Sequence, residues 1–168
     1  MDKITNSKAT ECARLWKEAF GDSDEFISSF IKNIYIGDNM LCVEQHGKVV
    51  SMLHFVPFEY DSSKVAYIYA VATAVNERGK GYARLLIRQA IEKAIHDGYK
   101  AVFTLPADDG LSGFYSQFGF KGRYAVTFET KNGFDFGTGD KEKDFVMALP
   151  LDREFVLTDG AEITLRTD

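Results

Sequence analysis

Cysteine is scarce in this sequence, which narrows the class of protein. Only Cys12 and Cys42 occur among 168 residues, and neither has a His or Cys beside it at metal-ligand spacing. A disulfide framework and a cysteine-based metal site therefore do not fit, and we expect two buried thiols rather than nucleophiles. The sequence also lacks an apolar run of membrane-spanning length and a cleavable leader pattern after Met1. We expect a cytoplasmic protein that binds no metal and no membrane.

Basic residues are also fewer than acidic ones. The 20 Lys and Arg residues are outnumbered by 25 Asp and Glu, which gives a formal net charge of −5. A general nucleic-acid binder needs a basic surface to neutralise phosphates, so that class is disfavoured. The acidity is compatible with a cationic small substrate, although many ordinary cytosolic proteins are equally acidic.

Apolar and aromatic residues, in contrast, are plentiful. They make up 45% and 14% of the chain, with 14 Phe and 8 Tyr, which is too apolar for a disordered protein. No repeat, low-complexity tract or long linker interrupts the sequence. We therefore predict one globular domain over residues 1–168, large enough to bury its own core.

Hydrophobic periodicity predicts an α/β (α+β) order of elements. The segment 65–74 is a strand that leads into a glycine loop and the helix 83–95, and the strand 101–105 follows, which implies a parallel crossover. The polar segment 130–144 is expected to be a flexible loop, and residues 158–160 to turn a terminal hairpin. His46-Gly47 is expected to turn a hairpin between the strands 40–45 and 49–60, and Gly98 to end the helix 83–95. The predicted helices cover 12–20, 26–34, 83–95 and 111–118, and the predicted strands cover 40–45, 49–60, 65–74, 101–105, 124–129 and 145–149, with a further strand around Ile4.

The glycine loop at residues 78–83 is the candidate binding site for an anion. Arg78-Gly79-Lys80-Gly81-Tyr82-Ala83 stands between a predicted strand and a helix N-terminus, where unpaired N–H groups and the helix dipole attract an anion such as pyrophosphate. Arg84 occupies the position of the third glycine of a dinucleotide fingerprint, and no Gly-Lys-Ser/Thr occurs, so the dinucleotide motif and the P-loop do not fit. A plain helix cap with two incidental glycines is the alternative.

The loop and a second motif resemble the GNAT superfamily (Gcn5-related N-acetyltransferases). The loop matches the family's Gln/Arg-x-x-Gly-x-Gly/Ala signature in its Arg-Gly-x-Gly form, and 113–120 match the Tyr-x-x-x-Gly-Phe block at the expected distance. Val71-Ala72-Thr73, Gly81-Tyr82-Ala83-Arg84 and Leu105-Pro106-Ala107 look most like the bacterial branch of enhanced-intracellular-survival-type acetyltransferases. The resemblance is sharp over 67–120 and only consistent elsewhere.

The resemblance implies a fold and a cofactor site. The GNAT fold is a mixed sheet of about six to seven strands with a splayed parallel pair, flanked by about four helices. Acetyl-CoA would lie between the strands 67–73 and 101–105. The backbone of Val71, Ala72 and Thr73 would bind the pantetheine arm, and the N–H groups of 78–83 would bind the pyrophosphate.

Two further residues take roles from the resemblance. Tyr115 aligns with the family's frequent general acid, because a phenol can protonate a departing thiolate of similar basicity; the alternative is an ordinary aromatic beside Phe114 and Phe118. Asp108 stands where many members carry Asn, and either Asp108 or Asp109 would orient the cofactor or attract a cationic substrate. A helix N-cap is an equally good reading of Asp108.

The resemblance implies an acetyl-CoA-dependent N-acetyltransferase that acts on a primary amine of a small molecule or peptide by direct attack in a ternary complex. The alternative is a non-catalytic acyl-CoA-binding sensor or interaction module. No general base is evident; His54, Glu44 and Glu59 are candidates by residue type alone. A homodimer is possible if the aromatic-rich strands 124–128 and 145–149 extend a sheet across an interface.

Overall fold

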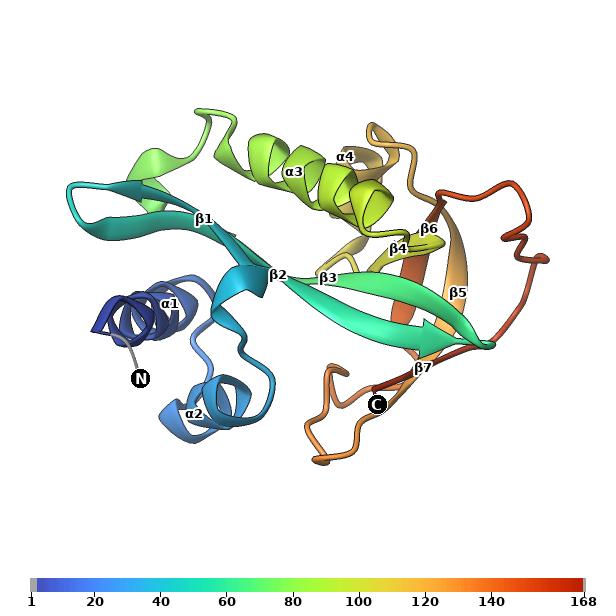
Figure 1. The fold of residues 1–168 in the computed structure, drawn as a ribbon, viewed down its shortest axis with the longest axis horizontal. Helices are drawn as coiled ribbons and strands as arrows, with labels where there is room; N and C mark the ends of the chain where they lie inside the picture. Colours follow the sequence, from blue (N-terminus) through green and yellow to red (C-terminus); the bar gives the residue numbers. More distant parts are fainter. Residues whose placement is uncertain (1–2, 168) are drawn as a thin grey trace. The chain divides into compact units, whose positions relative to one another are not determined.

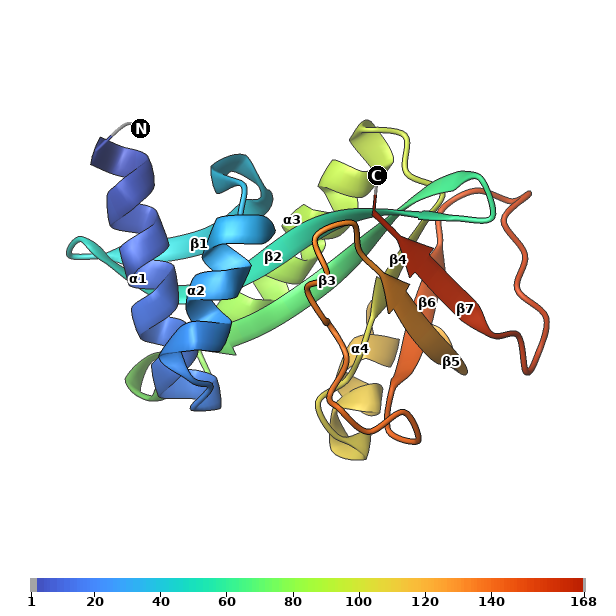
Figure 2. The same ribbon diagram turned by 90° about the horizontal axis from the view of Figure 1, so that it is seen from below.

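The computed structural model describes residues 3–167, without the side chains of residues 3–6 and 109. Within this part of the chain, four α-helices accompany one seven-stranded mixed sheet (Figures 1 and 2). The helices are α1 (Lys3–Phe20), α2 (Asp24–Asn33), α3 (Tyr82–His96) and α4 (Ser112–Ser116). The strands are β1 (Met40–Gln45), β2 (Lys48–Tyr60), β3 (Ser63–Thr73), β4 (Ala101–Thr104), β5 (Lys121–Glu129), β6 (Phe145–Pro150) and β7 (Ile163–Arg166), in the order β1-β2-β3-β4-β6-β5-β7.

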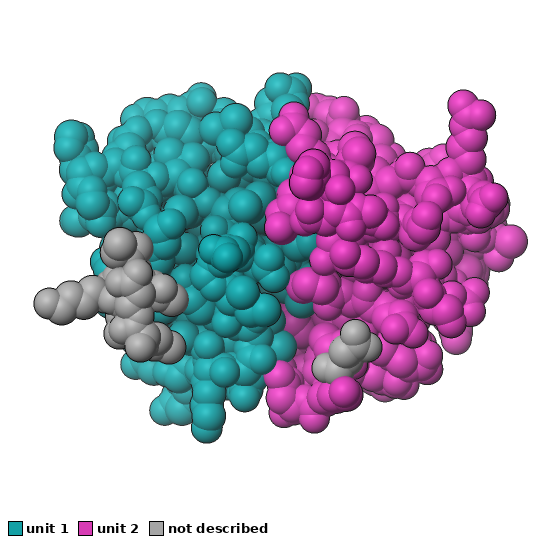
Figure 3. Space-filling model, viewed as in Figure 1, with its two compact units in different colours: residues 1–56, 69–90 teal, residues 57–68, 91–168 magenta. Residues whose placement is uncertain are grey.

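This architecture confirms the predicted mixed sheet and its parallel pair, since β3 and β4 run parallel. The chain divides into two compact units, shown in different colours in Figure 3. The first comprises 1–56 and 69–90, and the second comprises 57–68 and 91–168. Among the helices of residues 3–167, none has both the length and the apolar character that crossing a membrane requires.

In the first unit, α1 and α2 close over a core of aromatic side chains. Trp16 and Phe30 are almost fully buried, with ring centroids 4.7 Å apart. Ser23 caps α2 by accepting a hydrogen bond from the Phe26 N–H at 3.1 Å. The strand expected around Ile4 is wrong, because no Gly or Pro interrupts residues 3–20 and the helix extends back to Lys3.

The β1–β2 hairpin turns at the predicted dipeptide. His46 and Gly47 both have positive φ, 51° and 77°, as a two-residue turn with the right-handed twist of a hairpin requires. α1 is fastened to this hairpin: Glu11 accepts a hydrogen bond from the Val49 N–H at 3.0 Å, and Arg14 donates to the Val49 carbonyl at 2.9 Å. The pairing therefore holds the hairpin against α1.

In the second unit, the strands form a ring. β2 pairs with β3, β3 with β4, β4 with β6, β6 with β5, and β5 with β7. The ring closes where β7 pairs with β2, at Arg166 and Glu59. The terminal hairpin expected at 158–160 is wrong, because β7 pairs in parallel with β5 instead. β5 and β6 each have a strand on both sides, so a sheet extended across a dimer through either of them is not available in this fold.

The β5–β6 connection at 130–144 is a loop, as predicted, and buried side chains anchor it. Phe134 and Phe136 are 6% and 3% exposed, and the Phe136 ring lies 5.9 Å from that of Tyr67 on β3. Asp144 accepts hydrogen bonds from the Thr138 N–H and hydroxyl at 3.0 and 2.7 Å. Two buried rings and a buried carboxylate therefore fix the middle and the end of this connection.

Candidate functional site

The pairing of β3 with β4 ends before β3 does. The last parallel partners are Ile68 and Thr104, and β3 continues to Thr73. On its other side the chain stays bound to β2, where the Ala74 N–H donates to the Val50 carbonyl at 2.8 Å and the hydroxyls of Ser51 and Thr73 are 2.8 Å apart. The predicted pantetheine segment, Val71 to Thr73, thus lies beyond the β4 register.

A left-handed residue stands directly before that segment. Ala70 has φ +55°, within β3, a conformation that costs a non-glycine residue about 1–2 kcal/mol. Such strain inside a strand is kept where the surrounding structure fixes it and often marks a functional site. Sequence reasoning missed Ala70, because an alanine in a β-branched and aromatic run gives no sign of positive φ.

The glycine loop presents a row of unpaired amides at the start of α3. The first helical hydrogen bond of α3 runs from the Leu85 N–H to the Gly81 carbonyl at 3.0 Å. Among the described residues, the N–H groups of residues 79–83 donate to no other group. Gly79 and Gly81 have φ +80° and +83°, and a Cβ at either would meet open space. The loop therefore fits an anion that approaches its main chain.

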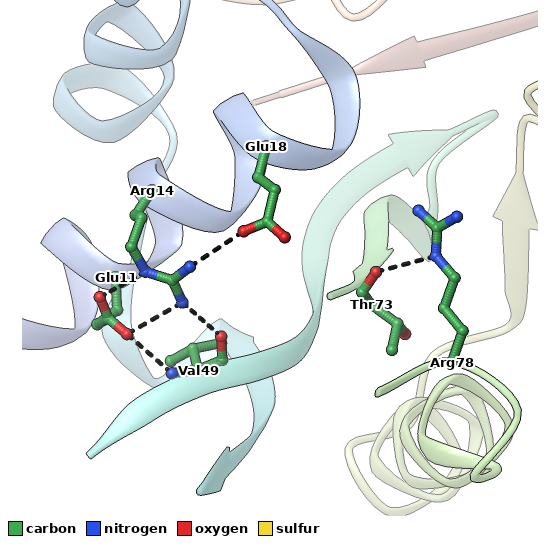
Figure 4. A network of polar contacts seen from close by, with 6 residues as sticks. All are labelled: Glu11, Arg14, Glu18, Val49, Thr73 and Arg78. Atoms are coloured by element: carbon green, nitrogen blue, oxygen red, sulfur yellow. Dashed lines mark hydrogen bonds and ion pairs between the residues drawn. The ribbon is translucent and has the colours of Figure 1, made fainter. Parts of the chain in front are cut away.

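The loop's cations are already engaged with the protein. Arg78 donates from Nε to the Thr73 carbonyl at 3.2 Å (Figure 4), and its own N–H points back to the Val75 carbonyl at 3.4 Å. Lys80 pairs with Glu77 at 2.6 Å, and that contact raises the Lys80 pKa. The sequence predicts that the N–H groups of residues 78–83 bind pyrophosphate. In the described part of the chain those of 79–83 are unpaired, whereas the Arg78 N–H is bonded to Val75.

A side chain of the hairpin steadies the loop. Gln45, the last residue of β1, donates from Nε2 to the Tyr82 hydroxyl, so the first residue of α3 is tied to the β1–β2 turn. Both residues belong to the first unit. Nothing in the spacing of Gln45 marks it in the sequence, since the contact joins residues 37 positions apart.

Tyr115 lies in the second unit, on α4, with its side chain 5% exposed. Burial raises its pKa above the ordinary value, while a hydrogen bond to the Thr104 side chain opposes the shift. The Thr104 hydroxyl also lies 3.5 Å from the Ile68 carbonyl. The Tyr115 hydroxyl is thus tied, through Thr104, to the last parallel pair of β3 and β4. Sequence reasoning did not identify Thr104.

Asp108 acts locally as a cap. Its Oδ1 accepts a hydrogen bond from the Leu111 N–H at 3.2 Å, and the side chain is exposed. This geometry matches the capping alternative for Asp108. The side chain of Asp109 lies outside the described residues.

The three candidate bases lie in different surroundings. Glu44 is exposed on β1, and Glu59 is exposed on β2 opposite Arg166. His54 is 2% exposed, with Nε2 3.3 Å from the Cys12 sulfur. Burial lowers the His54 pKa to about 3, more than a backbone hydrogen bond to Tyr69 raises it. His54 is therefore a neutral core residue, enclosed by the rings of Trp16 and Phe30.

His54 is expected to make the fold acid-sensitive. Its pKa is near 3 when folded and about 6.5 when unfolded, so the unfolded state gains the proton as pH falls below 6.5 and stability drops. Between pH 7 and pH 5 this residue should remove about 2 kcal/mol of the free energy of unfolding. Urea denaturation of wild type and His54→Leu at both pH values measures the difference. Equal losses of stability in the two proteins would contradict the assignment.

Both cysteines are free thiols. Burial raises the Cys12 pKa to about 12, and burial also raises that of Cys42. Neither is a thiolate at neutral pH, as a nucleophile would need to be. Among the side chains that the structure describes, no group of three or more His, Cys, Asp or Glu could hold a metal ion.

Comparison with known proteins places the chain among acetyltransferases. A family described as "Acetyltransferase (GNAT) domain" matches residues 1–122. An uncharacterized N-acetyltransferase of Escherichia coli K12, YhbS, is 30% identical over 84 residues, which cover 49% of this chain and 48% of YhbS. The match thus spans about half the length of this curated relative.

Solved structures share the fold at lower identity. A GNAT family acetyltransferase from Brucella melitensis, in complex with acetyl-CoA, has a TM-score of 0.62 and 18% identity over 93% of this chain and 88% of that one. YhbS from E. coli, in complex with CoA, has a TM-score of 0.63 and 18% identity over 100% and 87%. The ribosomal-protein-S18-alanine N-acetyltransferase of E. coli has a TM-score of 0.62 and 14% identity over 94% and 96%. On the extent of the family match, the chain belongs to the GNAT acetyltransferase family.

Proposed function

We propose that this protein transfers an acetyl group from acetyl-CoA to a primary amine of a small molecule or peptide, by direct attack in a ternary complex. The observation that carries the proposal is the row of unpaired amides of residues 79–83 at the start of α3. Solved structures with the same fold hold acetyl-CoA or CoA. The proposal includes one catalytic domain over residues 1–168.

The residues that would hold acetyl-CoA fit its chemistry. The amides of 79–83 would bind the pyrophosphate, with Arg78 and Lys80 supplying charge from the rim. The main chain of Val71, Ala72 and Thr73 would bind the pantetheine arm, because this part of β3 lies beyond the β4 register. Bound there, acetyl-CoA supplies an activated thioester. Asp108 caps a turn in the structure, and we propose that it also orients the cofactor or attracts a cationic substrate at the edge of this site.

Tyr115 would supply the proton for the departing thiolate. Its buried hydroxyl has a raised pKa, so it stays protonated at neutral pH. The acceptor is proposed to arrive as a neutral amine or to lose its proton to water, because His54 is enclosed and a pKa of about 3 makes it a weak proton acceptor. We assign no general base among the described residues.

The finer relationship is also a proposal. Val71-Ala72-Thr73, Gly81-Tyr82-Ala83-Arg84 and Leu105-Pro106-Ala107 favour the enhanced-intracellular-survival-type branch. A cytoplasmic location and a homodimer remain predictions, and β1, which ends the strand order, is the strand through which a sheet could extend.

The test is calorimetric titration of the purified protein with acetyl-CoA and, separately, with NAD. A free-thiol assay over polyamines, aminoglycosides, amino acids and short peptides follows. Saturable acetyl-CoA binding with amine-dependent thiol release supports the enzyme and identifies its acceptor class. Binding without release with every amine would favour the non-catalytic sensor. Absence of acetyl-CoA binding would contradict the assignment of the loop.

A further inference from the structure

One pocket is lined by residues that all belong to the second unit. It has a volume of about 370 Å³ and opens between the start of β5, the end of β6 and the segment 151–157 that leads towards β7. This volume is near the lower end of the roughly 300–1,000 Å³ typical of small-molecule sites. Its lining includes Lys121, Tyr124, Ala148, Leu151, Arg153 and Val156.

A β-bulge builds one wall of the pocket. The register of β5 against β6 shifts between Lys121 and Tyr124. Gly122 lies in that shift with φ +77°, and a Cβ there would meet the Tyr124 ring at 2.5 Å. Arg123 instead stacks on Phe145, 4.0 Å from the ring centroid. The bulge thus packs Tyr124 against a glycine backbone and engages Arg123 with a different ring, while Lys121 lines the pocket.

The opposite wall is held in place by its own contacts. The Leu151 N–H donates to the Lys100 carbonyl at 2.9 Å, and Lys100 pairs with Asp152 at 2.7 Å. The Phe155 ring lies 5.9 Å from that of Tyr60 and 6.2 Å from that of Phe103. Backbone, ion-pair and aromatic contacts therefore hold the segment 151–157 in place as a wall of the pocket.

The charges of the pocket do not cancel within it. Asp152 is the carboxylate in the pocket lining. It is neutralised by Lys100, and it also accepts a hydrogen bond from the Glu154 N–H at 2.9 Å. Within residues 3–167, Lys121 and Arg153 have no ion pair and no side-chain hydrogen bond. Val156, 75% exposed, leaves an apolar side chain at the rim. Two unpaired cations beside apolar walls match a ligand with one negative end and an apolar body.

We propose that this pocket binds a small organic carboxylate whose charge is held by Lys121 and Arg153 and whose apolar part lies against Tyr124, Leu151 and Val156. An oxygen anion can accept charge-assisted hydrogen bonds from both cations, and covering Val156 removes apolar surface from water. This pocket shares no residue with the proposed acetyl-CoA site, and the proposal does not depend on the proposed function.

The test compares three probes of one chain length: hexanoate, hexylammonium and hexanol. Each is titrated into ¹⁵N-labelled protein, and the amide shifts of residues 148–157 are followed by NMR. Hexanoate should move these amides in a saturable manner, at least about tenfold more tightly than either other probe. Lys121→Gln and Arg153→Gln should each weaken hexanoate about fivefold to tenfold. Arg123→Gln removes a neighbouring cation that Phe145 engages, and should leave the affinity unchanged.

Equal affinity for the three probes would overturn the proposal, since the pocket would then be a plain apolar crevice. Absence of saturable shifts with hexanoate would overturn it as well, as would an equal loss in Arg123→Gln and Arg153→Gln. Thermal unfolding of each variant confirms that the comparison is made on folded protein. Titration with acetyl-CoA reports separately on the glycine loop, so a failure at one site leaves the other to be judged by its own result.

Discussion

Replacing Gly81 with glutamate is expected to abolish acetyl-CoA binding. Gly81 has φ +83°, a conformation that L side chains rarely adopt, and it lies in the row of unpaired amides. The glutamate would add backbone strain and place a negative charge where the pyrophosphate is to bind. We expect the affinity measured by calorimetry to fall by about 100-fold or more, the equivalent of about 2.7 kcal/mol.

The matched control is Gly133→Glu. Gly133 has φ +77°, and a Cβ there also meets open space, but it lies in the β5–β6 connection. Both variants therefore carry a similar backbone strain and the same added charge. Loss of acetyl-CoA binding in Gly81→Glu alone would attribute the effect to the loop. Wild-type affinity in a folded Gly81→Glu protein would remove the basis of the proposed function.

Removing the Tyr115 hydroxyl should impair turnover and spare the cofactor. Tyr115→Phe keeps the ring, which packs 5.9 Å from Phe120, and deletes the group proposed to protonate the thiolate. General acid catalysis is worth about 100-fold to 10,000-fold, so kcat should fall by about 100-fold or more while the acetyl-CoA Kd stays within about twofold. Steady-state kinetics and calorimetry on the same preparation measure both.

Tyr99→Phe is the control, because it deletes the hydroxyl of another buried tyrosine, 9% exposed, outside the proposed site. It should retain wild-type kcat. The pH profile gives a second readout. Because burial raises the Tyr115 pKa above its ordinary value, loss of the phenol proton should reduce kcat only above the pH at which an ordinary tyrosine ionises. Wild-type kcat in Tyr115→Phe would reassign this residue to packing.

The elements that the sequence predicted well are those set by local signals. His46 and Gly47 lie at the turn of the hairpin, and β1 spans residues 40–45 as expected, because a two-residue turn between alternating strands is encoded within a few residues. The start of α3 and its glycine loop were predictable for the same reason. Gly98, with φ +79°, also follows α3 as expected of a C-terminal stop.

What could not be predicted depends on contacts between distant residues. β7 has only four residues, and its pairing with β5 joins Val126 to Ile163, which no local pattern encodes. Thr104 gains its contact with Tyr115 only when β4 and α4 are in place. The anchoring of the β5–β6 connection did have a signal in the sequence, because Phe134 and Phe136 stand at alternate positions and are both buried. The polar composition of the rest of the segment instead favoured a loop without anchoring contacts.

The strand ring of the second unit has a consequence for the order in which the chain can fold. β7 is the last of its strands to be synthesised, and it covers the edge of β5 that β6 leaves open. Until residues 163–166 emerge from the ribosome, β5 must present unpaired N–H and C=O groups to any neighbouring chain. The nascent second unit should therefore be most exposed to chaperones and to strand-exchange aggregation between the emergence of β5 and that of β7, and a stall before residue 163 would prolong that interval.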